Sequence, residues 1–124
     1  MMVDDMFPKI LAVDFDGTLV QDQYPMIGKI RKSVWDAVIK AQKEGWKIIL
    51  WSCRNGSDLK NAVEFCSDNG LHFDAINENL DEVKIMYGGD TRKVFADMYI
   101  DDRSAALLVK SGAVEFAPVD LERG

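Results

Sequence analysis

The chain has 124 residues, the length of one compact domain, and we interpret residues 1–124 as a single domain. Apolar residues make up 48% of the sequence and charged residues 29%, a composition that excludes fibrous and disordered classes. The formal net charge of -6 at pH 7 argues against nucleic acid or an anionic membrane as a partner.

The start of the chain, its two cysteines and its single histidine limit the localisation and the kinds of site that we expect. Residues 1–5 lack the positive segment of a secretory signal, and no apolar run reaches membrane-spanning length, so we expect a cytoplasmic protein without a membrane partner. Cys53 and Cys66 have no metal-ligand spacing and are expected to be reduced core thiols. His72 is the only histidine and cannot build a zinc site or a triad by itself.

Strand and helix patterns alternate along the first half of the chain. A short continuous apolar run is typical of a strand buried on both faces of a parallel sheet. Apolar residues that recur every three or four positions are typical of a helix, and a following glycine marks its end. These patterns predict, in chain order, a strand over residues 10–13, a helix over residues 30–44, a strand over residues 47–51 and a helix over residues 57–69.

The same alternation continues with weaker signals in the second half. The patterns predict a strand over residues 74–77, a helix over residues 80–87, a strand over residues 94–100, a helix over residues 105–110 and a strand over residues 113–116. Strands that alternate with helices imply right-handed crossovers. The predicted fold class is therefore α/β, a three-layer α/β/α Rossmann-like arrangement around a central, mainly parallel sheet.

Three of the predicted strands end in polar residues: Asp14, Ser52 and Asp101. In open α/β sheets the ligand binds beyond the carboxyl ends of the strands, so these side chains are expected at one site. A carboxylate beside a buried strand is costly without a compensating partner, and Mg²⁺ prefers carboxylate, water and phosphate oxygens as ligands. The structural alternative, that these acids only cap loops and helices, accounts for one of them better than for the set.

The residues after the first strand carry the most specific motif. They read DFDGTL over residues 14–19, with two acids that alternate, a glycine that permits unusual backbone geometry and the hydroxyl of Thr18. An apolar strand that runs into this sequence resembles the first signature of the haloacid dehalogenase superfamily, hydrolases that form an aspartyl phosphate.

Later segments resemble the other motifs of that superfamily in the required order. The apolar strand that ends in Ser52 is similar to the second motif, Lys93 to the basic third motif, and the pair Asp101 and Asp102 after an apolar strand to the fourth. The resemblance spans roughly residues 9–103, nearly all of the predicted core. It implies a phosphohydrolase with the fold predicted above.

The resemblance implies a role for each matched acid. Asp14 is expected to be the nucleophile that forms the aspartyl phosphate. Asp16 is expected to protonate the leaving oxygen and then to activate water, with its backbone carbonyl on the metal. The implied Mg²⁺ site consists of Asp14, Asp16, Asp101 and Asp102. For Asp102, a position as N-cap of the following helix is an open alternative.

Hydroxyl and basic residues complete the implied site. Ser52 is expected to donate a hydrogen bond to the phosphoryl group, and Lys93 to neutralise its charge, with Lys84 and Arg92 as competitors for that role. Thr18, Ser52 and Arg54 are the expected substrate-binding residues. Arg54 either forms a bidentate contact with a phosphate or a substrate carboxylate or is exposed to solvent. Arg103 is a second candidate site residue.

The lengths between the motifs leave no room for the cap domain that many relatives of this superfamily carry. A capless site implies a macromolecular substrate, or an oligomer whose neighbouring subunit covers the site, so we expect a phosphorylated small molecule or a polymer end as substrate. A noncatalytic phosphate- or metal-binding module of the same fold is the alternative function. A receiver-type phosphoacceptor domain is disfavoured because the strand that would carry its acceptor ends in Ser52. Aromatic side chains are expected to fill the core or an interface: Trp35, Trp46, Trp51 and Phe65.

Overall fold

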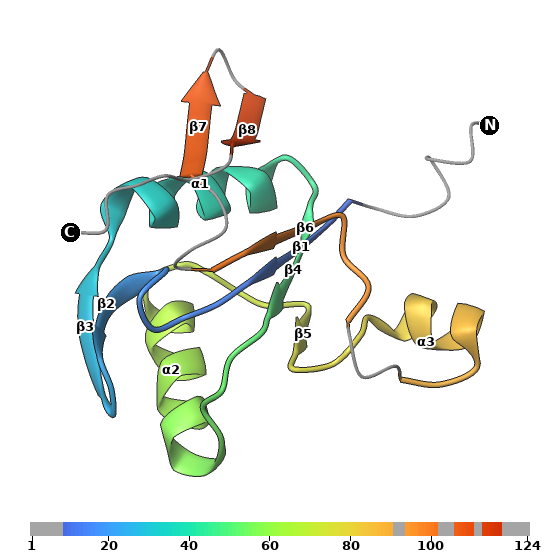
Figure 1. Ribbon diagram of the computed structural model, residues 1–124, viewed down its shortest axis with the longest axis horizontal. Helices are drawn as coiled ribbons and strands as arrows, with labels where there is room; N and C mark the ends of the chain where they lie inside the picture. Colours follow the sequence, from blue (N-terminus) through green and yellow to red (C-terminus); the bar gives the residue numbers. More distant parts are fainter. Residues whose placement is uncertain (1–8, 91–93, 102–105, 111–112, 118–124) are drawn as a thin grey trace.

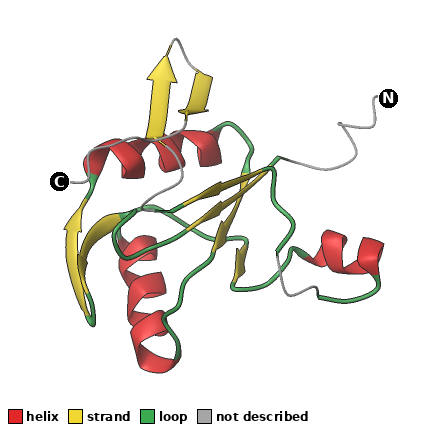
Figure 2. Ribbon diagram, viewed as in Figure 1, coloured by secondary structure: helices red, strands yellow, loops and turns green. Residues whose placement is uncertain are grey.

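The computed structural model describes residues 9–90, 94–101, 106–110 and 113–117 (Figure 1). Its elements in chain order are β1 (Ile10–Val13), β2 (Val20–Gln23), β3 (Met26–Ile30), α1 (Lys32–Lys43), β4 (Lys47–Leu50), α2 (Gly56–Asp68), β5 (Ala75–Ile76), α3 (Asp81–Tyr87), β6 (Met98–Ile100), β7 (Ala106–Lys110) and β8 (Ala113–Ala117). Figure 2 separates the helices from the strands and loops. None of the helices in the described ranges is long and apolar enough to cross a membrane.

A four-stranded sheet forms the centre of the molecule, with the strand order β5-β4-β1-β6. Each of its three pairings is parallel, and β1 lies between β4 and β6. All four residues of β1 are buried, as expected for a strand with neighbours on both sides and side chains packed on both faces. The predicted α/β class with a mainly parallel sheet is confirmed, and it is consistent with a Rossmann-like fold.

Alternate residues of β1 belong to two different cores, because successive side chains of a strand point to opposite faces. Leu11 and Val13 join a cluster with buried residues of α1 and α2, among them Trp35, Val38, Ala62 and Cys66. Ile10 and Ala12 join a second cluster on the opposite face with residues in or beside α3, namely Leu80, Val83 and Val94. Thus α1 and α2 pack on one face of β1, and α3 packs on the other.

Two acids at the amino ends of the strands are structural. The carboxylate of Asp97, just before β6, accepts a hydrogen bond of 2.7 Å from the backbone N–H of Ile10. The carboxylate of Asp74, just before β5, accepts one of 2.8 Å from the N–H of Ile48. Because both carboxylates satisfy backbone donors at strand ends, their places in the fold are explained without a ligand.

The predictions for the last third of the chain need two corrections. The helix predicted over residues 105–110 is wrong, because Ala106–Lys110 is strand β7 and pairs antiparallel with β8. This hairpin lies beside α1 in Figure 1. The strand predicted over residues 94–100 is shorter, since only Met98–Ile100 forms β6. A short apolar run such as that of β7 fits a helix or a strand equally well, and its pairing partner decides.

A small hairpin follows β1 on the way to α1. Strands β2 and β3 pair antiparallel, and the turn between them contains a cis peptide bond between Tyr24 and Pro25. The sequence patterns predicted neither of these two strands. The hairpin matters for the site because its tip supplies carbonyl groups to a buried arginine, as described below.

Candidate functional site at the carboxyl edge of the sheet

The loop after β1 turns sharply at Gly17, whose φ of 82° is a conformation that favours glycine. The N–H of Gly17 donates to the carbonyl of Val20 at 2.8 Å, and the N–H of Leu19 donates to that of Phe15 at 2.9 Å. Phe15 and Leu19 are fully buried and fix the loop to the core. The loop therefore leaves Asp14 at the carboxyl end of β1, where one of its carboxylate oxygens accepts the N–H of Phe15 at 2.8 Å.

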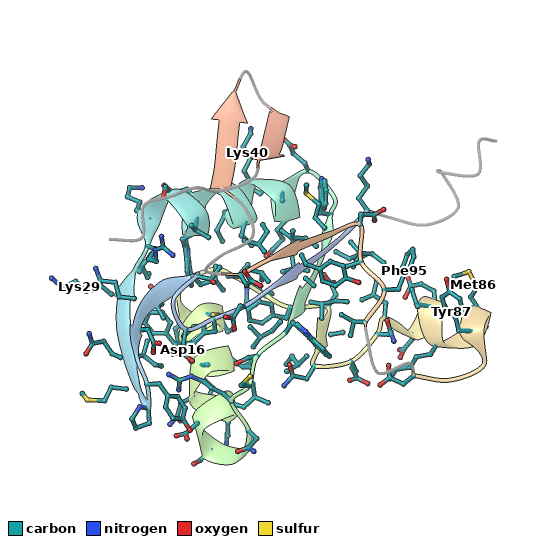
Figure 3. The ribbon with its side chains drawn as sticks, viewed as in Figure 1. Asp16, Lys29, Lys40, Met86, Tyr87 and Phe95 are labelled. Atoms are coloured by element: carbon teal, nitrogen blue, oxygen red, sulfur yellow. The ribbon has the colours of Figure 1, made fainter. Side chains whose placement is uncertain are left out.

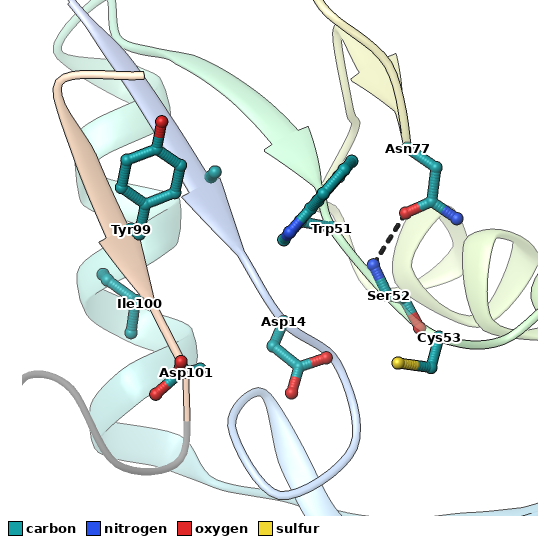
Figure 4. A pocket seen from close by; sticks show the side chains of 9 residues that line it. Asp14, Trp51, Ser52, Cys53, Asn77, Tyr99, Ile100 and Asp101 are labelled. Carbon is teal, nitrogen blue, oxygen red and sulfur yellow. Dashed lines mark hydrogen bonds between the residues drawn. The ribbon is translucent and has the colours of Figure 1, made fainter. Parts of the chain in front are cut away.

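Backbone hydrogen bonds extend the sheet register one residue beyond the strands. The N–H of Asp14 donates to the carbonyl of Ile100 at 2.9 Å, and the N–H of Trp51 donates to that of Val13 at 2.9 Å. Asp14 therefore lies between Asp101 on one side and Trp51 on the other. Figure 4 shows the side chains of Asp14 and Asp101 side by side at the ends of their strands. The structure thus brings together the two acids that the sequence assigned to one site.

A cavity of about 390 Å³ opens at this edge of the sheet. Its wall is formed by residues in or just after β1, β4, β5 and β6: Ala12, Asp14, Trp51, Ser52, Cys53, Asn77, Tyr99, Ile100 and Asp101. Its volume falls within the range of small-molecule sites. Three of the predicted site residues, Asp14, Ser52 and Asp101, lie in its wall.

Ser52 is held in the cavity wall by its neighbours. Its backbone N–H donates to the side-chain oxygen of Asn77 at 2.7 Å, the contact drawn in Figure 4. Asn77 itself has a φ of 53°, a left-handed conformation that asparagine tolerates better than most residues. The Ser52 hydroxyl oxygen accepts the N–H of Arg54 at 3.1 Å. Since that contact uses a lone pair, the hydroxyl proton can still be donated to a ligand.

Arg54 is buried, with an exposed fraction of 3%, and each of its N–H groups has an acceptor. Its Nε and Nη2 donate to the two carboxylate oxygens of Asp16 at 2.7 and 2.8 Å. The remaining donors bind the carbonyls of Pro25 at 3.1 Å, Asp58 at 3.3 Å and Met26 at 3.0 Å. One side chain therefore ties the loop after β1 to the β2–β3 hairpin and to α2.

Two aromatic rings enclose the same guanidinium. The rings of Phe15 and Tyr24 each lie 5.1 Å from the central carbon of Arg54, a cation–π arrangement. The hydrogen bonds with Asp16 raise the pKa of Arg54 above its ordinary value, because they favour the charged form. The interpretation of Arg54 as an exposed residue is wrong, and its donors are occupied within the protein.

The remaining predicted site residues lie away from the cavity wall or outside the described residues. The carboxylate of Asp16 is bound to Arg54, and Asp16, labelled in Figure 3, is not part of the cavity wall. Thr18, in the loop after β1, is buried. Lys84 forms an ion pair with Glu78 at α3. The predicted positions that the structure does not describe are Arg92, Lys93, Asp102 and Arg103.

The oxygen ligands of the cavity suit Mg²⁺, which takes one or two carboxylates together with water and phosphate oxygens. Asp14 and Asp101 provide two carboxylates at adjacent positions of the sheet edge. Among the residues with described positions, no group of three or more His, Cys, Asp or Glu side chains could hold a metal ion. The described residues therefore fit a Mg²⁺ site in which the protein supplies two carboxylates, and a phosphate ligand and water molecules supply the remaining oxygen ligands.

Sequence reasoning missed the apolar half of the cavity wall. Trp51 was expected to fill a core or an interface; it is 39% exposed and lines the cavity, so it is not a core residue. Cys53, expected in the core, is exposed there as well, whereas Cys66 is buried as expected. Tyr99 could have been found, because it lies on β6 two positions before Asp101, which directly follows that strand, and side chains two positions apart in an extended segment share a face.

Fold and site define an α/β protein whose parallel sheet carries two aspartates and an adjoining cavity at its carboxyl edge. No family model matches the chain. No curated protein matches it either. A solved structure, that of a conserved protein coded by a locus of Bacteroides thetaiotaomicron, has a TM-score of 0.69 and 40% sequence identity, and the match covers 79% of this chain and 78% of that one. The chain belongs to the same family as this conserved protein.

Proposed function

We propose that the chain is a Mg²⁺-dependent phosphohydrolase of the haloacid dehalogenase type, which cleaves a phosphomonoester through an aspartyl phosphate on Asp14. The observation that carries the proposal is the position of Asp14 and Asp101 next to each other in the wall of one cavity. Two carboxylates at such positions repel each other, and a divalent cation with a phosphate offsets that repulsion. The motif DFDGTL supports the same chemistry.

The proposal includes the architecture. Packing of α1 and α2 on one face of β1 and of α3 on the other supports a three-layer α/β/α arrangement. Between β1 and β4 the chain forms only the small hairpin and α1, which supports a capless enzyme. A phosphorylated small molecule or a polymer end is the proposed substrate.

In the proposed reaction a carboxylate oxygen of Asp14 attacks phosphorus, and the bond from phosphorus to the ester oxygen breaks. The departing alcohol takes a proton from Asp16, and a water molecule then attacks the aspartyl phosphate, gives its proton to Asp16 and releases phosphate. The hydroxyl of Ser52 donates to a phosphoryl oxygen throughout. When bound, Mg²⁺ would be held by Asp14 and Asp101 and would neutralise charge on the phosphoryl group.

The contact between Asp16 and Arg54 sets a condition on this reaction. Both carboxylate oxygens of Asp16 accept hydrogen bonds from Arg54, so the carboxyl group must leave Arg54 before it can reach the leaving oxygen. The proposal therefore includes a rotation of Asp16 during the reaction. Lys93 remains the proposed charge-neutralising residue.

Hydrolysis of an aryl phosphate with and without Mg²⁺ tests the proposal. We expect activity that requires Mg²⁺, is lost in Asp14→Asn and is retained in Asp68→Asn, a control at an exposed position on α2. A phosphoryl label that hydroxylamine releases should appear on the wild type and be absent from Asp14→Asn. A folded wild type that binds Mg²⁺ without turning over any phosphoester would instead identify a noncatalytic binding module.

A further inference from the structure

The cavity has an aromatic end as well as an acidic end. Tyr99 lies on β6 and Trp51 directly after β4, so the two rings stand on opposite sides of β1 (Figure 4). In the sheet register Ala12 of β1 pairs with Tyr99 on one side and with Ile49 on the other, and Trp51 follows two residues after Ile49, level with Asp14. Ala12 lines the cavity together with both rings. Since alanine has only a methyl group, the two rings border a slot over β1 that a larger residue would fill.

The two ends of the cavity are in line with each other along the strands. Ala12 precedes Asp14 by two residues, and Tyr99 precedes Asp101 by two, so each pair lies on the same face of the sheet. A strand rises about 3.3 Å per residue, which separates Ala12 and Tyr99 from Asp14 and Asp101 by roughly 7 Å along the strands. A phosphate at the acidic end therefore has room for its ester group to extend between the rings.

Both rings are partly exposed, and the hydroxyl of one is hydrogen-bonded. Trp51 and Tyr99 are 39% and 37% exposed, although both belong to the wall of the cavity. The hydroxyl of Tyr99 donates to the carbonyl of Val94, which restrains the ring. A restrained aromatic ring loses little conformational entropy when a ligand stacks on it.

We propose that Trp51 and Tyr99 form a stacking site for a planar aromatic ring carried by the phosphomonoester, so that the substrate is an aryl-type phosphate or a nucleoside monophosphate. This inference rests on the proposed function, because it places the phosphate at Asp14. Aromatic side chains stack on planar rings of many kinds, so the shared chemistry is the flat π face. The ring can belong to a nucleoside base or to a simple aromatic ester group, and substrates compared in matched pairs distinguish these two cases.

The first experiment compares substrates that differ only in the ring. Adenosine 5′-monophosphate is paired with ribose 5-phosphate, and benzyl phosphate with cyclohexylmethyl phosphate. We expect kcat/KM of the wild type to favour the aromatic member of at least one pair by about tenfold or more, because a ring stack is worth that much. The pair that shows the preference identifies the source of the ring.

Variants of Trp51 test whether the preference for the aromatic substrate arises from the slot between the two rings. Trp51→Leu should lower kcat/KM of the aromatic member about tenfold and that of its partner much less, whereas Trp51→Phe should keep most of the preference. Tyr87→Leu is the control, since Tyr87 is an exposed aromatic residue on α3 away from the cavity wall (Figure 3). Equal kcat/KM within both pairs, or an equal loss for both members in Trp51→Leu, would overturn the inference.

A binding measurement separates this inference from the proposed function. The indole N–H resonance of Trp51, assigned by its absence from Trp51→Phe, is followed in Asp14→Asn during titration with adenosine 5′-monophosphate and with benzyl phosphate. A shift of this resonance without any hydrolysis by the wild type supports the stacking site and refutes the phosphohydrolase. Hydrolysis without the shift refutes the stacking site, and the absence of both refutes the two together.

Discussion

Removal of the Arg54 guanidinium should destabilise the fold more than any other single loss of charge in the described part of the chain. Arg54→Met keeps much of the apolar volume between the rings of Phe15 and Tyr24 but removes all five donors. The carboxylate of Asp16, whose side chain is only 17% exposed, then loses both hydrogen bonds that Arg54 donates to it. Three backbone carbonyls also lose a donor.

The expected loss is about 3 kcal/mol of unfolding free energy. Removal of one partner of a buried ion pair costs about 3–5 kcal/mol, and the partial exposure of Asp16 places this case at the lower end of that range. Such a loss is a large fraction of the total stability of a small domain, which is about 5–15 kcal/mol. In an Asp16→Asn background the same substitution should cost about 2 kcal/mol less, because no charge is then left unpaired.

Urea unfolding of the wild type, the two single variants and the double variant measures these quantities, with the slope of the transition as a check on two-state behaviour. Lys32→Met is the control, since it breaks an exposed ion pair with Asp36 on α1 and should cost less than about 1 kcal/mol. A loss below about 1 kcal/mol in Arg54→Met, or the same loss with and without Asp16→Asn, would refute the reasoning.

Three further predictions follow from single positions. Thr18→Val should leave stability unchanged or raise it by up to about 1 kcal/mol in chemical unfolding, because the buried hydroxyl of Thr18 has no partner in the described structure; a larger loss would reveal one. Gly28→Ala should cost about 1–3 kcal/mol and lower Tm, because its Cβ would lie 2.1 Å from the carbonyl oxygen of Gln21; an unchanged Tm would contradict that packing. At pH 8 a thiol reagent should label Cys53 quickly and Cys66 only on unfolding, since burial raises the pKa of Cys66 to about 12 and keeps it protonated; two fast labels would contradict this.

The two inner strands of the central sheet, β1 and β4, could be predicted because they have strong local signals. The run of four buried residues in β1 and the helical spacing in α1 and α2 fix these elements without knowledge of their neighbours. For β7 the local signal was ambiguous, since alanine and leucine also suit a helix. The Ser-Gly dipeptide between β7 and β8 is a turn signal that could have favoured a hairpin instead.

The acidic half of the candidate site was predictable and the rest was not. Asp14 and Asp101 follow apolar strands directly, so the rule that strand ends meet at one edge places them together. The partner of Asp16 was not predictable in this way, because Arg54 lies 38 residues later and no periodic pattern links two residues across a hairpin, a helix and a strand. Nor does composition indicate whether a tryptophan such as Trp51 points into a core or into a cavity.

The alternation of side chains along β1 and β6 separates two kinds of evolutionary change. Substitution at Ala12 or Tyr99 would alter which ring fits the cavity while the positions of Asp14 and Asp101 stay the same. Insertion or deletion of one residue between Ala12 and Asp14, or between Tyr99 and Asp101, would instead turn the aspartate to the opposite face of the sheet. Point substitutions can therefore change the ligand preference among relatives of this chain. The number of residues between the ring-side position and the aspartate on each strand is expected to stay constant.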